Sequence, residues 1–166
     1  MLKFNMHCRA RKKSGFTLIE IVVVIGIIAI LALVAIPSQA NRFNQKRIAE
    51  TIELAENFKQ TIQAFYQLNG EFPADNEEAG MPAADKILGN YLEGIEVVDG
   101  AMHLQLGNKL TRFSGQIVSI FPVFVENSPA SPISWVCGNG STPEGMTIAG
   151  ENKTSISIAN LPLSCR

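Results

Sequence analysis

Residues 16–36 read FTLIEIVVVIGIIAILALVAI, and the only charged residue in this run is Glu20. From Ile21 to Ile36 nothing is more polar than Gly26. As a helix this run would be roughly 30 Å long, which matches the hydrocarbon thickness of a lipid bilayer. We therefore expect this part of the chain to enter a membrane at some stage.

Charge is distributed unevenly along the 166 residues. The first fifteen positions hold five basic residues and no acid, whereas the chain from Phe16 onward holds nine basic and fifteen acidic residues. The five basic residues before the apolar run outnumber those just beyond it, which are Arg42, Lys46 and Arg47. We therefore expect the first fifteen residues to stay in the cytoplasm. The excess of acidic residues from Phe16 onward argues against a nucleic-acid-binding domain of the usual basic type. A hydrophobic content of 46% argues against a disordered chain.

Two interpretations of the N-terminus follow from general rules. A cleaved secretory signal would use Ser38-Gln39-Ala40 as its small-x-small site, although such apolar regions are usually shorter. A simple anchor for a soluble domain explains the length but gives Glu20 no role. A carboxylate inside a membrane helix costs roughly 2.5–3.5 kcal/mol on insertion scales, so its presence calls for a partner.

A third interpretation comes from residues 12–20, which read KKSGFTLIE. This stretch resembles the start of type IV pilins and pseudopilins, in which a short basic leader ends in glycine and an F-T-L-I-E apolar helix follows. The resemblance implies that residues 1–15 are a leader (a class III signal peptide), that a prepilin peptidase cuts after Gly15, and that the same enzyme methylates Phe16. It also implies that Glu20 neutralises the Phe16 amine of a neighbouring subunit during assembly. A glutamate at the membrane edge that reaches the headgroups is the alternative that position alone leaves open.

Gly26 and Pro37 are the weak points of the apolar helix, because glycine costs about 1 kcal/mol relative to alanine and proline removes a helical hydrogen bond. We expect a bend or a loosened stretch between them. The resemblance implies that this part of the helix loosens inside the filament. An ordinary kinked anchor would have the same sequence.

The pattern becomes amphipathic beyond Pro37. Apolar residues recur at helical spacing on one stripe, at Ile48, Ile52, Ala55, Phe58, Ile62 and Phe65. Leu68-Asn69-Gly70 is typical of a helix end. We therefore predict one long helix from Phe16 to Leu68, whose stripe packs on a domain and whose apolar half protrudes.

The remaining chain favours strands. Asp99-Gly100 is a hairpin signal between the β-rich runs 95–98 and 101–106, and further strands are expected at 117–125 and 133–136. A short helix is expected over 83–91, and another hairpin from 147–149 to 154–158. Pro122 favours a sheet edge or a bulge. The predicted fold class is α+β, with the long helix packed on a roughly four-stranded antiparallel sheet. The predicted division is a cleaved leader (1–15), a transmembrane and filament-core helix (16–40), and an exported globular domain (41–166) that includes the amphipathic helix 41–69.

The three cysteines differ in the compartment that we expect for them. Cys8 would stay in the reducing cytoplasm with the leader, whereas Cys137 and Cys165 lie in the exported part, where a disulfide is expected. The sequence around Cys137 and Cys165 also resembles the disulfide-bounded C-terminal region of type IVa-like pilins. The resemblance thus extends from end to end of the chain, and its first forty residues are the most specific part.

Enzymatic interpretations gain little support from the sequence. His103 stands alone in a predicted strand without a companion nucleophile, no metal-ligand spacing is present beyond the leader, and no cofactor motif occurs. We expect no enzyme activity, metal or cofactor. The resemblance implies a structural pilus subunit that polymerises with its own kind, located in the inner membrane as a precursor and outside the cell when assembled. Its further partners would be the prepilin peptidase and an inner-membrane assembly platform, and the pili would serve adhesion, twitching motility or DNA uptake.

Two alternatives to an abundant pilin remain. One is a minor or competence pilin that presents Lys109, Arg112, Lys153 and Arg166 to DNA or another partner, although four scattered charges on an acidic body disfavour DNA. The other is a type II secretion pseudopilin, which shares the N-terminal signature. Against it, the C-terminal cysteine pair fits pilins better.

Overall fold

A computed structural model describes residues 15–166, without the side chains of residues 33–40. The predicted leader up to Ser14 and the side chain of Pro37 therefore lie outside the described part. Contacts divide the chain into two units, Met1–Gln39 and Ala40–Arg166, and each is described by itself. No helix in the described part is long and apolar enough to cross a membrane.

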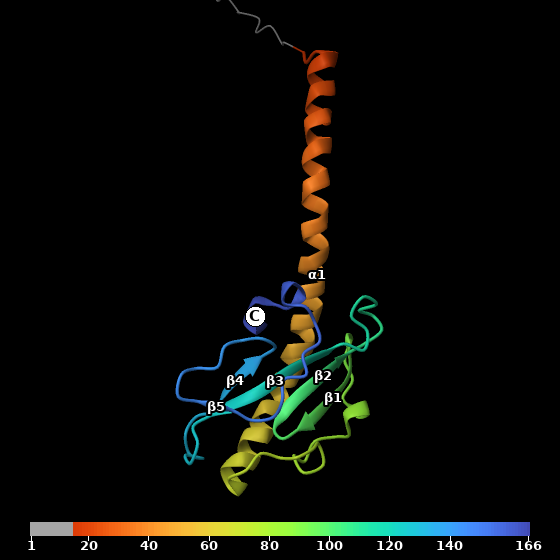
Figure 1. Cartoon of the computed structure of the whole chain (residues 1–166). Coiled ribbons are helices and arrows are strands. Elements are labelled where there is room, and N and C mark those ends of the chain that lie inside the picture. The colour runs from red at the N-terminus through yellow and green to blue at the C-terminus, as the bar shows by residue number, and fades with distance from the viewer. Residues whose placement is uncertain (1–14) are drawn as a thin grey trace, which may run out of the picture. The chain divides into compact units, whose positions relative to one another are not determined.

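The elements follow one another as a long helix and then a sheet (Figure 1). Their bounds are α1 Leu18–Asn69, the 3-10 turn η1 Ala84–Lys86, β1 Leu92–Val98, β2 Ala101–Leu106, β3 Ile117–Phe124, β4 Ser134–Cys137, β5 Thr147–Ile148, and the 3-10 turns η2 Ile158–Asn160 and η3 Leu163–Cys165.

The second half of α1 packs as its periodicity predicts. Ile48, Ala55 and Ile62 on the stripe are fully buried, and Ile52 and Phe58 pack against the same core. The helix ends at Asn69, where Gly70 takes a φ of 78° and donates its N–H to the Tyr66 carbonyl at 2.8 Å. Glycine adopts this left-handed conformation without the penalty that a side chain would bring.

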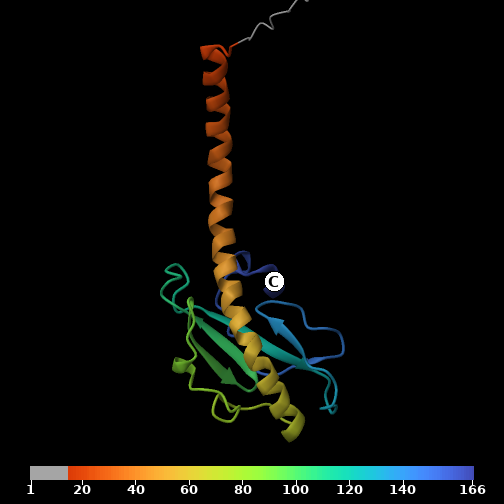
Figure 2. The same cartoon turned by 180° about the vertical axis from the view of Figure 1, so that it is seen from behind.

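The sheet is antiparallel, with the order β1-β2-β3-β4 and the short β5 beside β3. Asp99 and Gly100 form the hairpin between β1 and β2 with φ values of 49° and 81°, as the two-residue turn signal predicts. From residue 40 onward, α1 lies across one face of this sheet, as the views from front and back agree (Figures 1 and 2). The predicted α+β fold of a helix on an antiparallel sheet is therefore confirmed.

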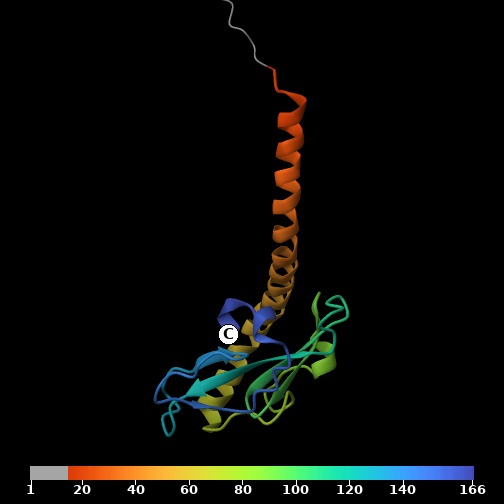
Figure 3. The same cartoon turned by 45° about the horizontal axis from the view of Figure 1, so that its top comes forward.

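Both faces of the sheet are covered. Leu104 and Ile120 point into the main core beneath α1, whereas Phe121 and Val123 belong to a second cluster on the outer face, with Met146 packed against it. The tilted view in Figure 3 shows α1 passing behind the strands, and Ile156, Leu161 and Cys165 of the C-terminal chain join the main core on the α1 side. Strands that are buried on both faces lose the simple alternation of apolar and polar residues.

Two predicted elements are wrong. The helix over 83–91 is reduced to η1, because the chain turns at Gly89 and enters β1 at Leu92. The strand over 154–158 is replaced by an extended segment whose hydroxyl groups bind β3. Thr154 Oγ1 accepts the Ser119 N–H at 3.0 Å, and Ser155 Oγ accepts the Ile117 N–H at 2.9 Å.

Pro122 lies inside β3, between two other strands. The pairing of β3 with β2 ends at Ile120, and its pairing with β5 begins at Val123. The carbonyl of Pro122 accepts the Ala149 N–H at 3.0 Å on that side. The residue without an N–H therefore stands where β3 changes partner, so the sheet tolerates a proline away from its edge.

Candidate processing and assembly site

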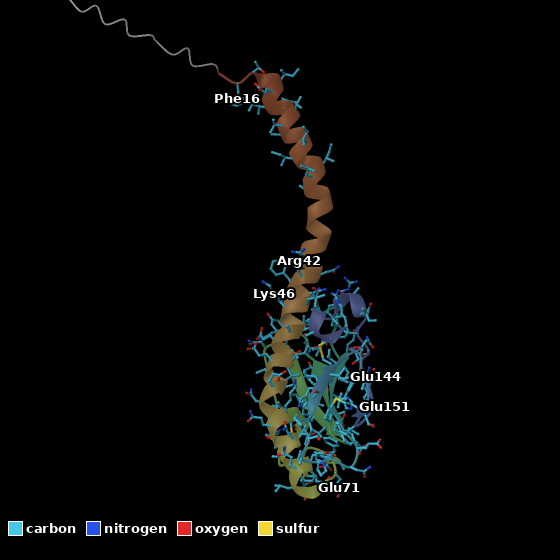
Figure 4. The ribbon with its side chains drawn as sticks, turned by 90° about the vertical axis from the view of Figure 1, so that its left-hand side faces the viewer. Phe16, Arg42, Lys46, Glu71, Glu144 and Glu151 are labelled. Atoms are coloured by element: carbon cyan, nitrogen blue, oxygen red, sulfur yellow. A yellow bond between two sulfur atoms is a disulfide. The ribbon has the colours of Figure 1, made fainter. Side chains whose placement is uncertain are left out.

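The bond between Gly15 and Phe16 precedes the helix. Residues 15–17 have no regular structure, α1 begins at Leu18, and the Phe16 side chain is 79% exposed (Figure 4). A peptidase needs an extended and accessible segment, because a helical backbone already uses its own amide groups. The geometry is thus compatible with the cleavage that the sequence predicts.

Thr17 and Glu20 cap the start of α1 for each other. Thr17 Oγ1 accepts the Glu20 N–H at 3.4 Å, and Glu20 Oε2 accepts the Thr17 N–H at 3.5 Å. This reciprocal pair is a capping box, and the spacing T-x-x-E before an apolar run is its sequence signature. Thr17 was not among the site residues predicted from the sequence, although this signature is present at residues 17–20. Glu20 therefore has a local structural role besides any role between subunits.

The first half of α1 presents apolar side chains on all sides. Together with Phe16, which precedes the helix, its large apolar residues are each between 47% and 84% exposed: Leu18, Ile19, Ile21, Val22, Val23, Val24, Ile25, Ile27, Ile28, Ile30 and Leu31. An exposed apolar surface of this extent marks an interaction surface. Residues 15–166 leave this surface largely exposed, so it is available to a partner outside the chain.

Gly26 lies within this surface, and a Cβ atom built on it would have no heavy atom within 4 Å. No contact in the isolated chain therefore requires a glycine there. The helix is continuous through Gly26 and position 37. The predicted loosening between Gly26 and Pro37 concerns the assembled filament and stays a prediction.

The C-terminal region is closed by a disulfide. Cys137 at the end of β4 and Cys165 in η3 are bonded, with Cα atoms 4.5 Å apart. Inside this loop, Asn152 Nδ2 donates to the Gly138 carbonyl at 2.7 Å, and Lys153 N donates to Ser119 Oγ at 2.9 Å. The disulfide, whose two cysteines lie in the main core, and these hydrogen bonds tie the loop to the sheet.

The outer face also carries a row of polar residues on three neighbouring strands. Glu96, His103 and Ser119 are opposite one another in β1, β2 and β3. His103 Nδ1 lies 2.9 Å from Ser119 Oγ, and both side chains are buried. Burial and the charge of Lys153 lower the pKa of His103, whereas Glu96 and Glu151 act in the opposite direction. Ser119 is fully buried and its oxygen accepts the Lys153 N–H, so it is not placed as a nucleophile.

A cavity of about 260 Å³ borders this row and is lined by acidic groups, among them Asp85, Glu93 and Glu96, with His103 and Gln105. Within residues 15–166, no group of three or more His, Cys, Asp or Glu side chains could hold a metal ion. Of the four cations that the sequence analysis considered for DNA, Lys109 and Arg112 lie in the β2–β3 loop, whereas Lys153 lies along the outer face of the sheet.

The fold and the exposed apolar N-terminus together define a pilin. A family model described as the prokaryotic N-terminal methylation motif matches residues 10–36, and one described as pilin (bacterial filament) matches residues 47–166. The chain therefore belongs to the type IV pilin family, and it is a structural subunit of an extracellular pilus.

Two of the relatives described below match over almost the whole length, and a third matches over half of it. The chain is 31% identical over 164 residues to a fimbrial protein of Neisseria meningitidis serogroup B, covering 93% of this chain and 94% of the relative. It is 30% identical over 161 residues to the type IV major pilin protein PilE of Neisseria gonorrhoeae, with 93% and 94% covered. The fimbrial protein EcpC of Eikenella corrodens is 36% identical over 85 residues, with 51% and 54% covered.

Proposed function

We propose that this chain is made as a membrane-inserted prepilin, cut between Gly15 and Phe16, methylated on Phe16 and polymerised as an abundant subunit of a type IV pilus. The observation that carries the proposal is the exposed apolar first half of α1, preceded by an accessible Gly15–Phe16 bond. The name of the gonococcal relative, a major pilin, supports the abundant role.

Cleavage creates the group that Glu20 would need as a partner. The new α-amine on Phe16 has an ordinary pKa of about 8, so it is mostly cationic at neutral pH. The Glu20 carboxylate has two oxygens, and one of them caps Thr17. The other can accept the methylated amine of a neighbouring subunit, which offsets the cost of placing both charges in an apolar core.

The catalytic steps belong to partners of the chain. We propose that a prepilin peptidase cuts and methylates it and that an inner-membrane platform adds it to the filament. The assembled pilus would serve adhesion, twitching motility or DNA uptake. The globular unit, closed by the Cys137–Cys165 disulfide, would form the filament surface.

N-terminal mass analysis of filaments sheared from cells, and separately of membranes, tests this proposal. Methylated Phe16 as the main N-terminus in sheared filaments would support an abundant pilin. The same species confined to membranes or traces would support a minor pilin or a pseudopilin instead. A mature start at Asn41, or an uncut chain, would overturn the prepilin interpretation.

The role of Glu20 needs a matched pair of variants. Glu20→Gln keeps the size and the cap-accepting oxygen but removes the charge, so we expect normal cleavage and a loss of sheared filament of at least tenfold. Glu53→Gln removes the charge of an exposed glutamate on the same helix, outside the apolar surface, and should leave filament yield unchanged. Equal yields from the two variants would remove the proposed role of Glu20.

A further inference from the structure

The unit 40–166 carries most of its cations at one end. It has nine basic and fourteen acidic residues. Six of the nine basic residues are exposed and belong to the part of α1 where the unit begins, to the β2–β3 loop and to the C-terminus, and we call this set the cationic end: Arg42, Lys46, Arg47, Lys109, Arg112 and Arg166. Figure 4 shows Arg42 and Lys46 at this end. Because the unit as a whole is acidic, the remainder of the unit outside the cationic end has a strongly negative net charge.

Three separate segments meet at the cationic end. Arg47 lies over the Tyr91 ring at 5.4 Å, and the Tyr91 carbonyl accepts the Gly107 N–H at the start of the β2–β3 loop. The Ala159 carbonyl accepts bonds from Gln45 Nε2 at 2.9 Å and from Arg166 Nη2 at 3.4 Å. The β2–β3 loop and the turns η2 and η3 lie at this same end in the front and back views (Figures 1 and 2).

The cations of this end have no acidic partner. All fifteen acidic side chains of the chain lie in the described part, and the ion pairs found there join Lys59 to Glu56 and Lys86 to Asp85. Glu50 borders the cationic end but accepts an amide bond from Asn90. The positive charge is therefore available to a partner.

The opposite end of the same unit is negative. It is formed where α1 ends and where the β1–β2 and β3–β4 turns lie, and Asp99 N donates to the Ala74 carbonyl at 3.3 Å. The exposed acids of the segment after α1 and of these two turns, which we call the acidic end, are Glu71, Asp75, Glu77, Glu78, Asp99 and Glu126. No basic residue stands among them. Figure 4 shows Glu71 at this end. Along α1 the two ends are separated by residues 42–69, which is about 40 Å at 1.5 Å per residue.

We infer that the cationic end of one subunit docks on the acidic end of a second copy of this chain. This inference rests on the proposed filament, in which all subunits point the same way, so that a shift along the axis brings unlike ends together. Such a contact is head-to-tail and repeats without closing, as a fibre requires.

Each end also offers an apolar side chain for the centre of such a contact. Leu163 in η3 is 83% exposed at the cationic end, and Leu68 is 85% exposed at the acidic end. Interfaces commonly place apolar side chains inside a polar rim. Complementary charge around them also selects one orientation of the partner and disfavours the reverse, in which like ends would meet.

A charge swap in the full chain, produced in cells whose own machinery assembles it, tests this contact. The cationic variant is Lys109→Glu with Arg112→Glu, and the acidic variant is Glu71→Lys with Glu77→Lys. Each should lower the yield of sheared filament at least fivefold at an unchanged level of processed subunit in the membrane. The four changes together should restore the yield to within twofold of the natural chain. The control, Lys153→Glu with Glu144→Lys, reverses charges outside both ends and should match the natural yield.

Each of the other outcomes would contradict either the proposed contact or the proposed function. The contact is overturned if both double variants give the natural filament yield, or if the combined variant does not restore it. In either case the natural chain would still form filaments, so the proposed function would stand. The cationic variant could instead lower the amount of processed subunit in the membrane while the acidic variant leaves the filament yield unchanged. That result would mean that the cationic end binds anionic lipid headgroups, and it would overturn the subunit contact. A natural chain that gives no filament would overturn the proposed function itself.

Discussion

The protonation of His103 depends on its burial and on the groups around it. Ser119 Oγ accepts the Lys153 N–H and lies 2.9 Å from His103 Nδ1, so this hydroxyl is the hydrogen-bond partner of one ring nitrogen. The other ring nitrogen, Nε2, is buried without a hydrogen-bond partner in the described part of the chain. A second proton would place a cation in the same buried position, and burial is the first cause that lowers the pKa of His103.

This lowered pKa predicts a loss of stability in mild acid. As pH falls below the ordinary histidine value of 6.5, the unfolded chain takes up a proton before the folded chain does. Stability is therefore full above that value and falls as pH decreases toward the lower folded pKa. His103 is the only histidine after residue 15, so this part of the pH dependence belongs to it.

The measurement is the free energy of unfolding by urea between about pH 7.5 and 5.5, on the full chain in detergent. His103→Asn keeps an acceptor near Nδ1 but cannot titrate, so its curve should be flatter than that of the natural chain over this range. Parallel curves for the two chains would show that His103 does not cause the loss.

At the scale of elements, the buried stripe of α1 holds the helix to the sheet. Ile62 is fully buried, whereas Leu68 on the same helix is 85% exposed. Ile62→Ala removes methylene groups from a packed core and should lower the free energy of unfolding by about 2–5 kcal/mol. Leu68→Ala should change it by no more than about 0.5 kcal/mol. Urea unfolding of both variants checks the contrast, and similar losses would mean that the stripe does not carry the packing.

The elements predicted correctly are those fixed by local patterns. The 3.6-residue period of the stripe, the glycine after Asn69 and the Asp99-Gly100 turn each act within a few residues. The strand at 154–158 was predicted wrongly because Thr154 and Ser155 bind β3 through side-chain hydroxyls. Such bonds depend on which strand lies alongside, and the sequence of the segment does not contain that information.

In the candidate site too, the sequence predicts the local features and not those that depend on folding. The apolar run and the lone Glu20 follow from elementary chemistry, whereas cleavage at Gly15 came only from a resemblance. The capping bond between Thr17 and Glu20 is local, so its spacing predicts it. The cationic end is different, because Arg47, Arg112 and Arg166 are distant in sequence and only folding brings their three segments together.

At the scale of the whole molecule, the chain separates into two units between Gln39 and Ala40. The core of the second unit uses residues from Ile48 to Cys165, so none of it is lost if the first unit is removed. The exposed apolar surface from Phe16 to Leu31 is lost completely. A chain that starts at Ala40 should therefore fold without the segment that drives association.

We predict that residues 40–166, exported to an oxidising compartment, are monomeric and form the Cys137–Cys165 disulfide. Their free energy of unfolding should equal that of the full chain in detergent within about 0.5 kcal/mol, because parts without a shared core contribute independently. Urea unfolding, with the mass of the intact chain to confirm the disulfide, checks this. Cys137→Ser with Cys165→Ser in the same fragment should cost about 2–4 kcal/mol, since the bond closes a long loop in the unfolded chain. A fragment that aggregates or unfolds without cooperativity would show that the second unit needs the first for its stability.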